Sequence, residues 1–526
     1  MRPLLRLLHL LAIAGLLLAS CSSSGDGLER SADASTTTSP TTPATDAEGE
    51  PTGEPASPVL RLGLAGPMSL DPAAISPASV SSMILVDLVH DTLTRLDDDG
   101  VAQPRLATFE PNADRTVWRF HLRDDARFVD GSAITPEDVV SSIDRVRGQG
   151  GSSLAAIQLE DVQAVSPSGP NTVDFVLRSP SAVLPELLAS PVYGIVDRDL
   201  LPTAVGAPLN PSGAFRVEAT APDRMVLTRW RGEGVDRVEL RLFSEDAGAY
   251  EAFVAGELDW SPVPIDRLGE ATDRYGQQAL APFHGSLLLG MNLRVDPLHS
   301  PEVRRAISLA IDRATLTDAV FGPTAQPMKG LIPAGVPGAA GECRGVCGPD
   351  VARARELVAQ VFGGAPPPPL RLLTDDTATQ TAIAGVLEEQ LAAAGFEVST
   401  ASVAPAGYDE ALRSGQPQLF LYSALGLGRS PASHLLPWAS GSPDNVTGYA
   451  NGLVDAALLA ALAEPDPGVR RTRWQEVEAG ILGDVPVVPL AQLRTVAVQR
   501  AQVQGLRIAA DGSIDVSDVT FDGAGR

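Results

Sequence analysis

Apolar and polar residues follow two different periods along the chain, and together they predict a mixed α/β body. The apolar run at 59–64 is typical of a buried strand, and strict alternation at 116–122 predicts a strand with one buried face. Residues 81–96 repeat with the period of a helix and end at an acidic turn. A second helix is predicted to begin at Thr135, where a capping residue precedes a proline and two acids, and to end near residue 147.

The clearest architecture is predicted between residues 370 and 422. Here three apolar strands alternate with two helices, in the order strand 370–373, helix 381–394, strand 396–398, helix 408–413 and strand 418–422. This order predicts a parallel sheet with right-handed crossovers. Ligands of open α/β sheets bind beyond the carboxyl ends of the strands, and residues 422–425 form such an end.

The N-terminus has the pattern of an export signal. Arg2 and Arg6 precede an apolar run over 7–18, which at about 12 residues is too short to span a bilayer. The run ends in Leu-Ala-Ser-Cys, which resembles the bacterial lipobox, so we expect residues 1–20 to be removed and Cys21 to carry the lipid anchor. The alternative is an ordinary secretory signal with an incidental cysteine.

Residues 21–58 are predicted to be a disordered tether. They are rich in Ser, Thr, Pro, Gly and acidic residues, a composition that cannot bury enough apolar surface to offset the entropy of ordering. Such a segment would hold the folded body away from the membrane.

Cys343 and Cys347 lie in a glycine-rich stretch and are separated by three residues. A structural zinc site needs about four ligands, and no histidine is near; a redox pair is usually separated by two residues. In an exported protein the favoured interpretation is a disulfide that closes a short loop.

Composition narrows the possible functions. The chain has 526 residues, enough for two to four domains, and a net charge of -25, which disfavours binding to nucleic acid. Lys329 is the one lysine, and its neighbours match neither a phosphate-binding loop nor a Ser-x-x-Lys nucleophile. The five histidines after residue 20 show no metal-ligand spacing. No catalytic residue, metal or cofactor is therefore predicted, although a hydrolase built from scattered carboxylates stays as an alternative.

A series of short motifs resembles one family, the extracytoplasmic solute-binding proteins of family 5, which serve peptide- and nickel-type ABC importers. The motifs are HDTLTRL at 90–96, PRLA at 104–107, TVWRFHLR at 116–123, FVDG at 128–131, TPEDV at 135–139, SIDRV at 142–146, PSGAF at 211–215, GELD at 256–259, VRRAISLAIDR at 303–313, NVTGY at 445–449 and VD at 454–455. Their order and spacing cover residues 58 to 510 and carry the assignment.

The resemblance implies a fold, a location and partners. The implied fold is the type II periplasmic-binding-protein fold of cluster C, in which two lobes joined by a hinge close over a ligand. Lobe I is expected at 59–79, 189–283 and 485–526, an accessory lobe at 80–188 and lobe II at 284–484. The protein would be a lipid-anchored monomer on the extracytoplasmic face of the cell membrane, with an ABC permease and its ATPase subunits as partners. It would bind a peptide or another small solute and catalyse no reaction.

One departure from the family pattern affects the ligand. In dipeptide- and oligopeptide-binding members an aspartate after the third strand of lobe II anchors the peptide ammonium. Here the matching stretch at 422–431 contains no acid and no tryptophan, and Leu427 stands where the anchor would be. Loss of a buried charge partner costs about 2–5 kcal/mol, so a sugar, a modified peptide, a lipidic or an amphiphilic molecule stays open beside a peptide. Nickel is disfavoured because no histidine cluster is present.

Three segments are predicted to converge at the ligand cleft. They are Met68, Ser69 and Leu70 after the first strand; Asn292 after an apolar run; and Tyr422, Ser423, Ala424, Leu425 and Leu427 at the end of the last strand of lobe II. The alternative is that Tyr422 and Met68 are core residues. Because Leu425 and Leu427 replace polar residues, we expect an apolar wall there. A ligand-sensing lipoprotein of the same fold, without transport, is the second functional alternative.

Overall fold

Most strands belong to one mixed sheet in the computed structural model, which describes residues 58–66, 68–75, 79–150, 153–201, 209–276, 280–340, 348–425, 429–509 and 512–522. The strand order is β15-β14-β16-β12-β17-β11-β1-β10-β9-β8, and β13 pairs with β17. In chain order the bounds are β1 Val59–Ala65, β8 Phe215–Ala221, β9 Arg224–Arg229, β10 Arg237–Phe243, β11 Trp260–Pro262, β12 Leu280–Met291, β13 Ala325–Pro327, β14 Leu370–Asp375, β15 Val398–Val403, β16 Leu419–Leu425 and β17 Val487–Gln499. We refer to β11-β1-β10-β9-β8 as the lobe I half and to β15-β14-β16 as the lobe II half.

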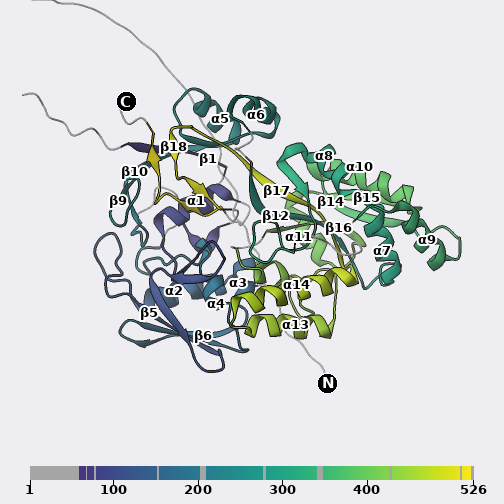
Figure 1. The fold of residues 1–526 in the computed structure, drawn as a ribbon, viewed down its shortest axis with the longest axis horizontal. Helices are drawn as coiled ribbons and strands as arrows, with labels where there is room; N and C mark the ends of the chain where they lie inside the picture. Colours follow the sequence, from purple (N-terminus) through teal and green to yellow (C-terminus); the bar gives the residue numbers. More distant parts are fainter. Residues whose placement is uncertain are drawn as a thin grey trace, which may run out of the picture. The chain divides into compact units, whose positions relative to one another are not determined.

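The two halves are joined by β12 and β17, which run antiparallel side by side (Figure 1). One end of β17 pairs with β11, at Trp260↔Gln499, while its other end pairs with β12 at Gly290↔Val487. A register shift interrupts the β12–β17 pairing between Pro282 and Ser286. β17 thus pairs with β11 of the lobe I half and with the shared strand β12, and the boundary expected at 485 stays a prediction.

The parallel sheet predicted between 370 and 422 is confirmed. β14 pairs in parallel with both β15 and β16. Helices α10 (Ala378–Ala393) and α11 (Pro405–Arg413) connect these strands. Leu372, Leu387 and Leu391 are almost fully buried in the apolar core on which α7 (Pro301–Ala310), α8 (Arg313–Phe321) and α9 (Val351–Phe362) also pack.

A second sheet of four strands forms the body of the accessory lobe, in the order β4-β5-β7-β6. Its strands are β4 (Ala107–Pro111), β5 (Val117–Leu122), β6 (Val162–Gly169) and β7 (Thr172–Leu177). The alternation predicted at 116–122 buries Trp118 and Phe120, and the Phe120 ring meets Phe175 edge-on at a centroid distance of 5.0 Å. Helix α2 (Pro136–Arg147) packs on this sheet.

The helix predicted over 81–96 was too long. Helix α1 spans Val80–Val89, and residues Thr94–Leu96 form strand β2, which pairs with β3 (Ala102–Pro104). The helix ends because His90 adopts an extended backbone and its Nε2 lies 3.1 Å from the carbonyl oxygen of Leu70. A long-range contact, which the local period cannot report, thus stops the helix. No described helix is long and apolar enough to cross a bilayer.

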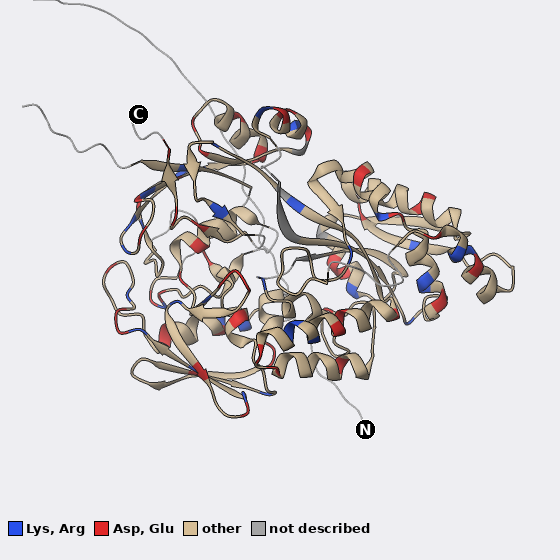
Figure 2. Cartoon of the chain, viewed as in Figure 1, with Lys and Arg blue, Asp and Glu red and all other residues tan. Residues whose placement is uncertain are grey.

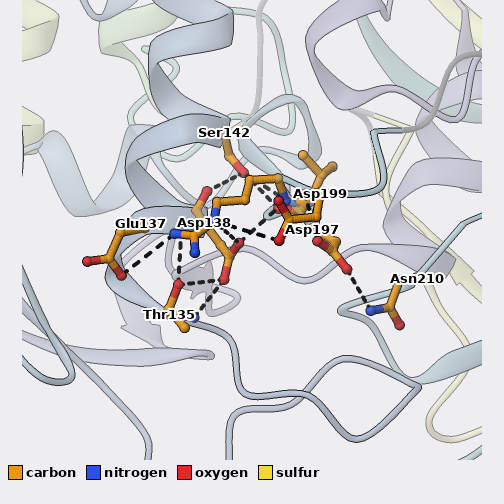
Figure 3. Close-up of polar contacts among 9 residues, drawn as sticks. Thr135, Glu137, Asp138, Ser142, Asp197, Asp199 and Asn210 are labelled. Carbon is orange, nitrogen blue, oxygen red and sulfur yellow. Dashed lines mark hydrogen bonds and ion pairs between the residues drawn. The ribbon is translucent and has the colours of Figure 1, made fainter.

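A capping network at the start of α2 ties the accessory lobe to the segment that follows it (Figure 3). The hydroxyl and backbone N–H of Thr135 donate to Asp138 Oδ2 at 2.7 and 2.9 Å, and Asp138 N–H donates to Thr135 Oγ1 at 3.3 Å. Further along the helix, Ser142 Oγ accepts a bond of 3.0 Å from the backbone N–H of Val196. Asp138 Oδ1 also accepts from the backbone N–H of Arg198 at 3.4 Å, so the capping residue and the helix both hold the segment that follows the accessory lobe.

We predict that Asp138→Ala lowers the free energy of unfolding by about 1–3 kcal/mol, because it removes the cap of α2 and leaves buried donors without acceptors. The matched control is Asp144→Ala, an exposed acid on the same helix, which should change it by less than about 0.5 kcal/mol. Chemical denaturation measures both. Equal effects of the two substitutions would contradict the structural role given to Asp138.

Candidate functional site

A large cavity lies where lobe I, the accessory lobe and lobe II meet. Its volume is about 1240 Å³, above the range of roughly 300–1,000 Å³ that is common for small-molecule sites. The wall includes Trp260 and Val498 from β11 and β17, Arg95 from β2, and Gly335 and Arg429 from lobe II. The space is large enough for a short peptide or a solute of similar size.

The rim of this cavity is closed on one side by a contact between lobe II and the accessory lobe. The guanidinium of Arg429 donates to the backbone carbonyl oxygens of Asp97 and Asp98 at 3.3 and 3.1 Å. Arg429 comes four residues after the end of β16 in the sequence. Asp97 and Asp98 belong to the turn of the β2–β3 hairpin.

A second contact inserts part of the accessory lobe into lobe II. Val183 and Leu187 are buried in the same apolar cluster as Trp474. Glu186, on α4 (Leu184–Leu187), forms an ion pair with Arg470 on α14 (Pro467–Asp484), and each side chain is only 7% exposed. Three different kinds of contact, apolar, ionic and backbone (Ala182 N–H to Leu462 O, 2.6 Å), therefore hold the two lobes together here.

The predicted residues that follow β1 lie in lobe I. Met68 is half-buried against the lobe I core and lines a separate cavity of about 700 Å³ at the ends of β1 and β10. Ser69 engages its neighbours, since its N–H donates to Ser82 Oγ at 3.2 Å and its Oγ accepts from Asp71 N–H at 3.0 Å. The Leu70 side chain is buried in the core. None of these three residues lines the large cavity, so their part in binding stays a prediction.

Asn292 does not meet the other predicted segments. Because β12 and β16 are antiparallel, Met291 pairs with Leu419 whereas Gly285 pairs with Leu425. Asn292 thus lies at the end of the pair opposite Leu425, about 20 Å away at the usual rise per residue. Its buried amide donates to the carbonyls of Gly415 and Pro417 at 2.9 and 3.0 Å. The expected convergence failed for Asn292 because the apolar run could not reveal strand direction.

Tyr422 to Leu425 are part of β16 rather than a loop beyond it. Tyr422 pairs with Leu288, is half-buried, and its ring meets Trp438 edge-on at 6.5 Å; burial raises the pKa of its hydroxyl. Ser423 is exposed, and Ala424 and Leu425 pair with Ser286 and Gly285. A ligand role for this strand end stays a prediction.

Cys21, Cys343, Cys347 and Leu427 lie outside the described residues. Their predicted roles in lipidation, in a disulfide and in the apolar wall therefore stay predictions. The cavity instead brings forward residues that the sequence did not single out, among them Arg95, Ser190, Tyr275, Arg429 and Arg500. Arg95 stands inside the HDTLTRL motif and Arg429 inside the stretch 422–431, whereas Ser190, Tyr275 and Arg500 are far apart in sequence and gave no local signal.

Comparisons with known proteins agree with this architecture. The model of the bacterial extracellular solute-binding proteins, family 5 (middle part), matches residues 101–445. The chain is 22% identical to the dipeptide-binding protein DppE of Bacillus subtilis strain 168 over 493 residues, which cover 86% of this chain and 89% of that protein. It is 24% identical to the probable deoxycholate-binding periplasmic protein YgiS of Escherichia coli K12 over 461 residues, covering 80% and 86%.

The fold also matches solved structures. The structure of HbpA2 from Haemophilus parasuis superposes with a TM-score of 0.75 at 18% identity, covering 88% of this chain and all of that one. These findings define a solute-binding protein with the type II periplasmic-binding-protein fold. The chain belongs to the bacterial extracellular solute-binding proteins of family 5.

The contact between the lobes can be tested at its ion pair. We predict that Arg470→Met lowers the free energy of unfolding by about 3–5 kcal/mol, because it leaves the buried carboxylate of Glu186 unpaired. The double variant Glu186→Leu/Arg470→Met should recover most of that loss, since no buried charge is then left. Arg473→Met, on the same helix but 40% exposed, is the control and should cost less than about 1 kcal/mol. A loss for Arg470→Met no larger than that of the control would contradict the assigned role.

Proposed function

We propose that this protein is the substrate-binding lipoprotein of an ABC importer. It captures a peptide or another small solute in the large cavity and delivers it to the membrane permease, which the ATPase subunits drive. The observation that carries the proposal is the cavity of about 1240 Å³ at the junction of three lobes, beside two strands that both main lobes share. A shared strand pair is a structure that lets two lobes approach each other around a ligand.

The names of the similar proteins support a small solute as the ligand but do not agree on its chemical class. A relative named as dipeptide-binding favours a peptide, and one named as probably deoxycholate-binding shows that a member of similar length can be assigned another solute. The missing acid at 422–431 argues against recognition of a free ammonium by the usual aspartate. We therefore propose a solute whose recognition does not depend on that contact.

The remaining parts of the proposal follow from the sequence. Lipid attached at Cys21 would keep the receptor, a monomer, on the extracytoplasmic face of the membrane beside its permease. The tether at 21–58 would give it reach. The division into lobe I at 59–79, 189–283 and 485–526, accessory lobe at 80–188 and lobe II at 284–484 is kept as a proposal. The chain would carry no catalytic site.

Binding and uptake together test this function. A thermal-shift panel of peptides, sugars and amphiphiles, followed by calorimetry, should find a solute that binds one per chain. At a hundredfold excess over Kd it should raise the free energy of unfolding by about 2.7 kcal/mol. The ligand should be recovered chemically unchanged, and deletion of the receptor gene should abolish its uptake by cells. Hydrolysis of the ligand would favour the enzyme alternative, and normal uptake in the deletion strain would favour the sensing alternative.

The lipid anchor has its own test. Cys21→Ala should leave the export signal uncut by the lipoprotein signal peptidase, or release a soluble chain, because the acylated thiol is lost. Fractionation and intact mass measure this directly, with Cys343→Ala as the control that should leave membrane attachment unchanged. A Cys21→Ala protein that stays membrane-bound with the normal mature mass would show that the anchor lies elsewhere.

A further inference from the structure

The wall of the large cavity carries an excess of guanidinium groups over available carboxylates. Its arginines are Arg95, Arg105, Arg429, Arg500 and Arg507, and its acids are Asp87, Asp97, Asp98 and Asp515. This local excess occurs in a chain whose net charge is -25 and in which acidic residues are spread over all parts (Figure 2). The wall thus holds one more arginine than aspartate, whereas the protein as a whole has an excess of acids.

Two of the arginines are already neutralised. Arg105 lies 3.2 Å from Asp87 and 2.6 Å from Asp91, and Arg507 lies 2.7 Å from Asp515 and 2.9 Å from Asp518. In these ion pairs the negative charges of Asp87 and Asp515 are balanced by the two arginines. They leave little attraction for a ligand at either guanidinium.

The other three arginines have no carboxylate within 4.0 Å among the described residues. Arg429 donates only to the carbonyls of Asp97 and Asp98. Arg500 donates to the carbonyls of Leu258 and Phe253, and its guanidinium carbon lies 4.2 Å from the centre of the Phe253 ring. Carbonyls satisfy hydrogen bonds but do not cancel the positive charge.

Arg95 is exposed on β2, and within the described part of the chain its side chain contacts no hydrogen-bond or ionic partner. On the acidic side, the carboxylate of Asp97 is engaged in its own turn, accepting from Val101 N–H at 2.9 Å and Gln103 Nε2 at 2.8 Å. These neutral donors do not cancel the negative charge of Asp97, so Asp97 and Asp98 are the two acids of the wall that form no ion pair within 4.0 Å in the described part of the chain. Three arginines without an ion pair thus face two such aspartates in the described wall.

Two hydroxyl groups in the same wall point to a ligand independently of charge. Ser190 is only 3% exposed, and its Oγ has no hydrogen-bond partner among the described residues. The hydroxyl of Tyr275 is likewise buried and unpartnered in the described structure. A buried hydroxyl without a partner is costly, so a hydrogen bond to a solute that reached these groups would stabilise both of them.

We propose that the cavity selects a solute that carries an oxyanion, either a carboxylate or a phosphate. Arg95 and Arg429 supply the positive charge, with Arg500 deeper in the wall, and Ser190 and Tyr275 donate hydrogen bonds. A guanidinium presents paired N–H donors that match the two oxygens of such a group. This inference rests on the proposed receptor function and names the ligand class of that same site.

Matched probes that differ in one charge provide the test. Calorimetry compares N-acetyl-trialanine, which carries one free carboxylate, with N-acetyl-trialaninamide, which is neutral, and with trialaninamide, which is cationic. Glucose 6-phosphate against glucose forms the phosphate arm. In at least one arm the anionic member should bind about tenfold or more tighter than its neutral partner, and raising the salt concentration should reduce that preference.

Variants then locate the preference. Arg95→Gln should weaken the anionic probe about tenfold and leave the neutral probe unchanged. Ser190→Ala should weaken it about threefold without lowering thermal stability, because the native hydroxyl bonds to no described protein group; a structural role for Ser190 would lower stability as well. Arg353→Gln changes net charge equally but lies on the exposed face of α9, and should have no effect on binding.

The outcomes separate this inference from the function on which it rests. If the neutral or cationic probe binds as tightly as the anionic one in both arms, or if no anionic probe binds, the oxyanion preference is wrong while another solute can still be imported. An equal loss in Arg95→Gln and Arg353→Gln would also overturn it, because the effect would then reflect net charge. If no solute of any charge binds, the receptor function itself fails.

Discussion

Strands β12 and β17 carry the backbone hydrogen bonds on which the rest of the architecture depends. Both lobes contribute to this one antiparallel pair, so each lobe is positioned relative to the other through backbone hydrogen bonds between strands. The register of the ladder shifts at two places, between Pro282 and Ser286 and between Leu287 and Leu288. Local irregularities in an otherwise paired structure are where bending is least costly, and we infer that lobe movement is concentrated at these two places.

The accessory lobe restricts that movement further, because it is tied to both main lobes. The cap of α2 holds it to the segment at 196–198. Val183, Leu187 and the Glu186–Arg470 pair hold it to lobe II. A buried ion pair contributes little net stability over an apolar substitute, but it is costly to separate, so it favours one arrangement of the lobes over others. The accessory-lobe segments of the cavity wall are therefore positioned by contacts to lobe I and by contacts to lobe II.

Local patterns in the sequence predicted those parts of the fold that local chemistry determines. The parallel strands around β14, the cap at Thr135 and the alternation that buries Trp118 and Phe120 were all correct. Errors arose where distant contacts decide the outcome. Helix α1 ends early because His90 meets Leu70, and Asn292 lies far from Leu425 because an apolar strand carries no mark of its direction.

The candidate site was less predictable than the fold for the same reason. Arg95, Ser190 and Arg500 belong to three separate parts of the sequence, and each is unremarkable in its own neighbourhood. These residues become candidates because of missing partners within the described structure. The two arginines have no carboxylate nearby, and the serine hydroxyl has no hydrogen-bond partner. Such absences can be seen only when all the possible partners have been placed around them.

Native mass spectrometry of the mature protein purified from its own host tests the central claim most directly. The claim is that each chain holds one solute in the cavity between its lobes. The account predicts a mass excess corresponding to one small anionic molecule per chain, released when the protein unfolds and reduced in the Arg95→Gln protein. A chain that carries no bound molecule, even after incubation with a small-molecule extract of that host, would contradict it.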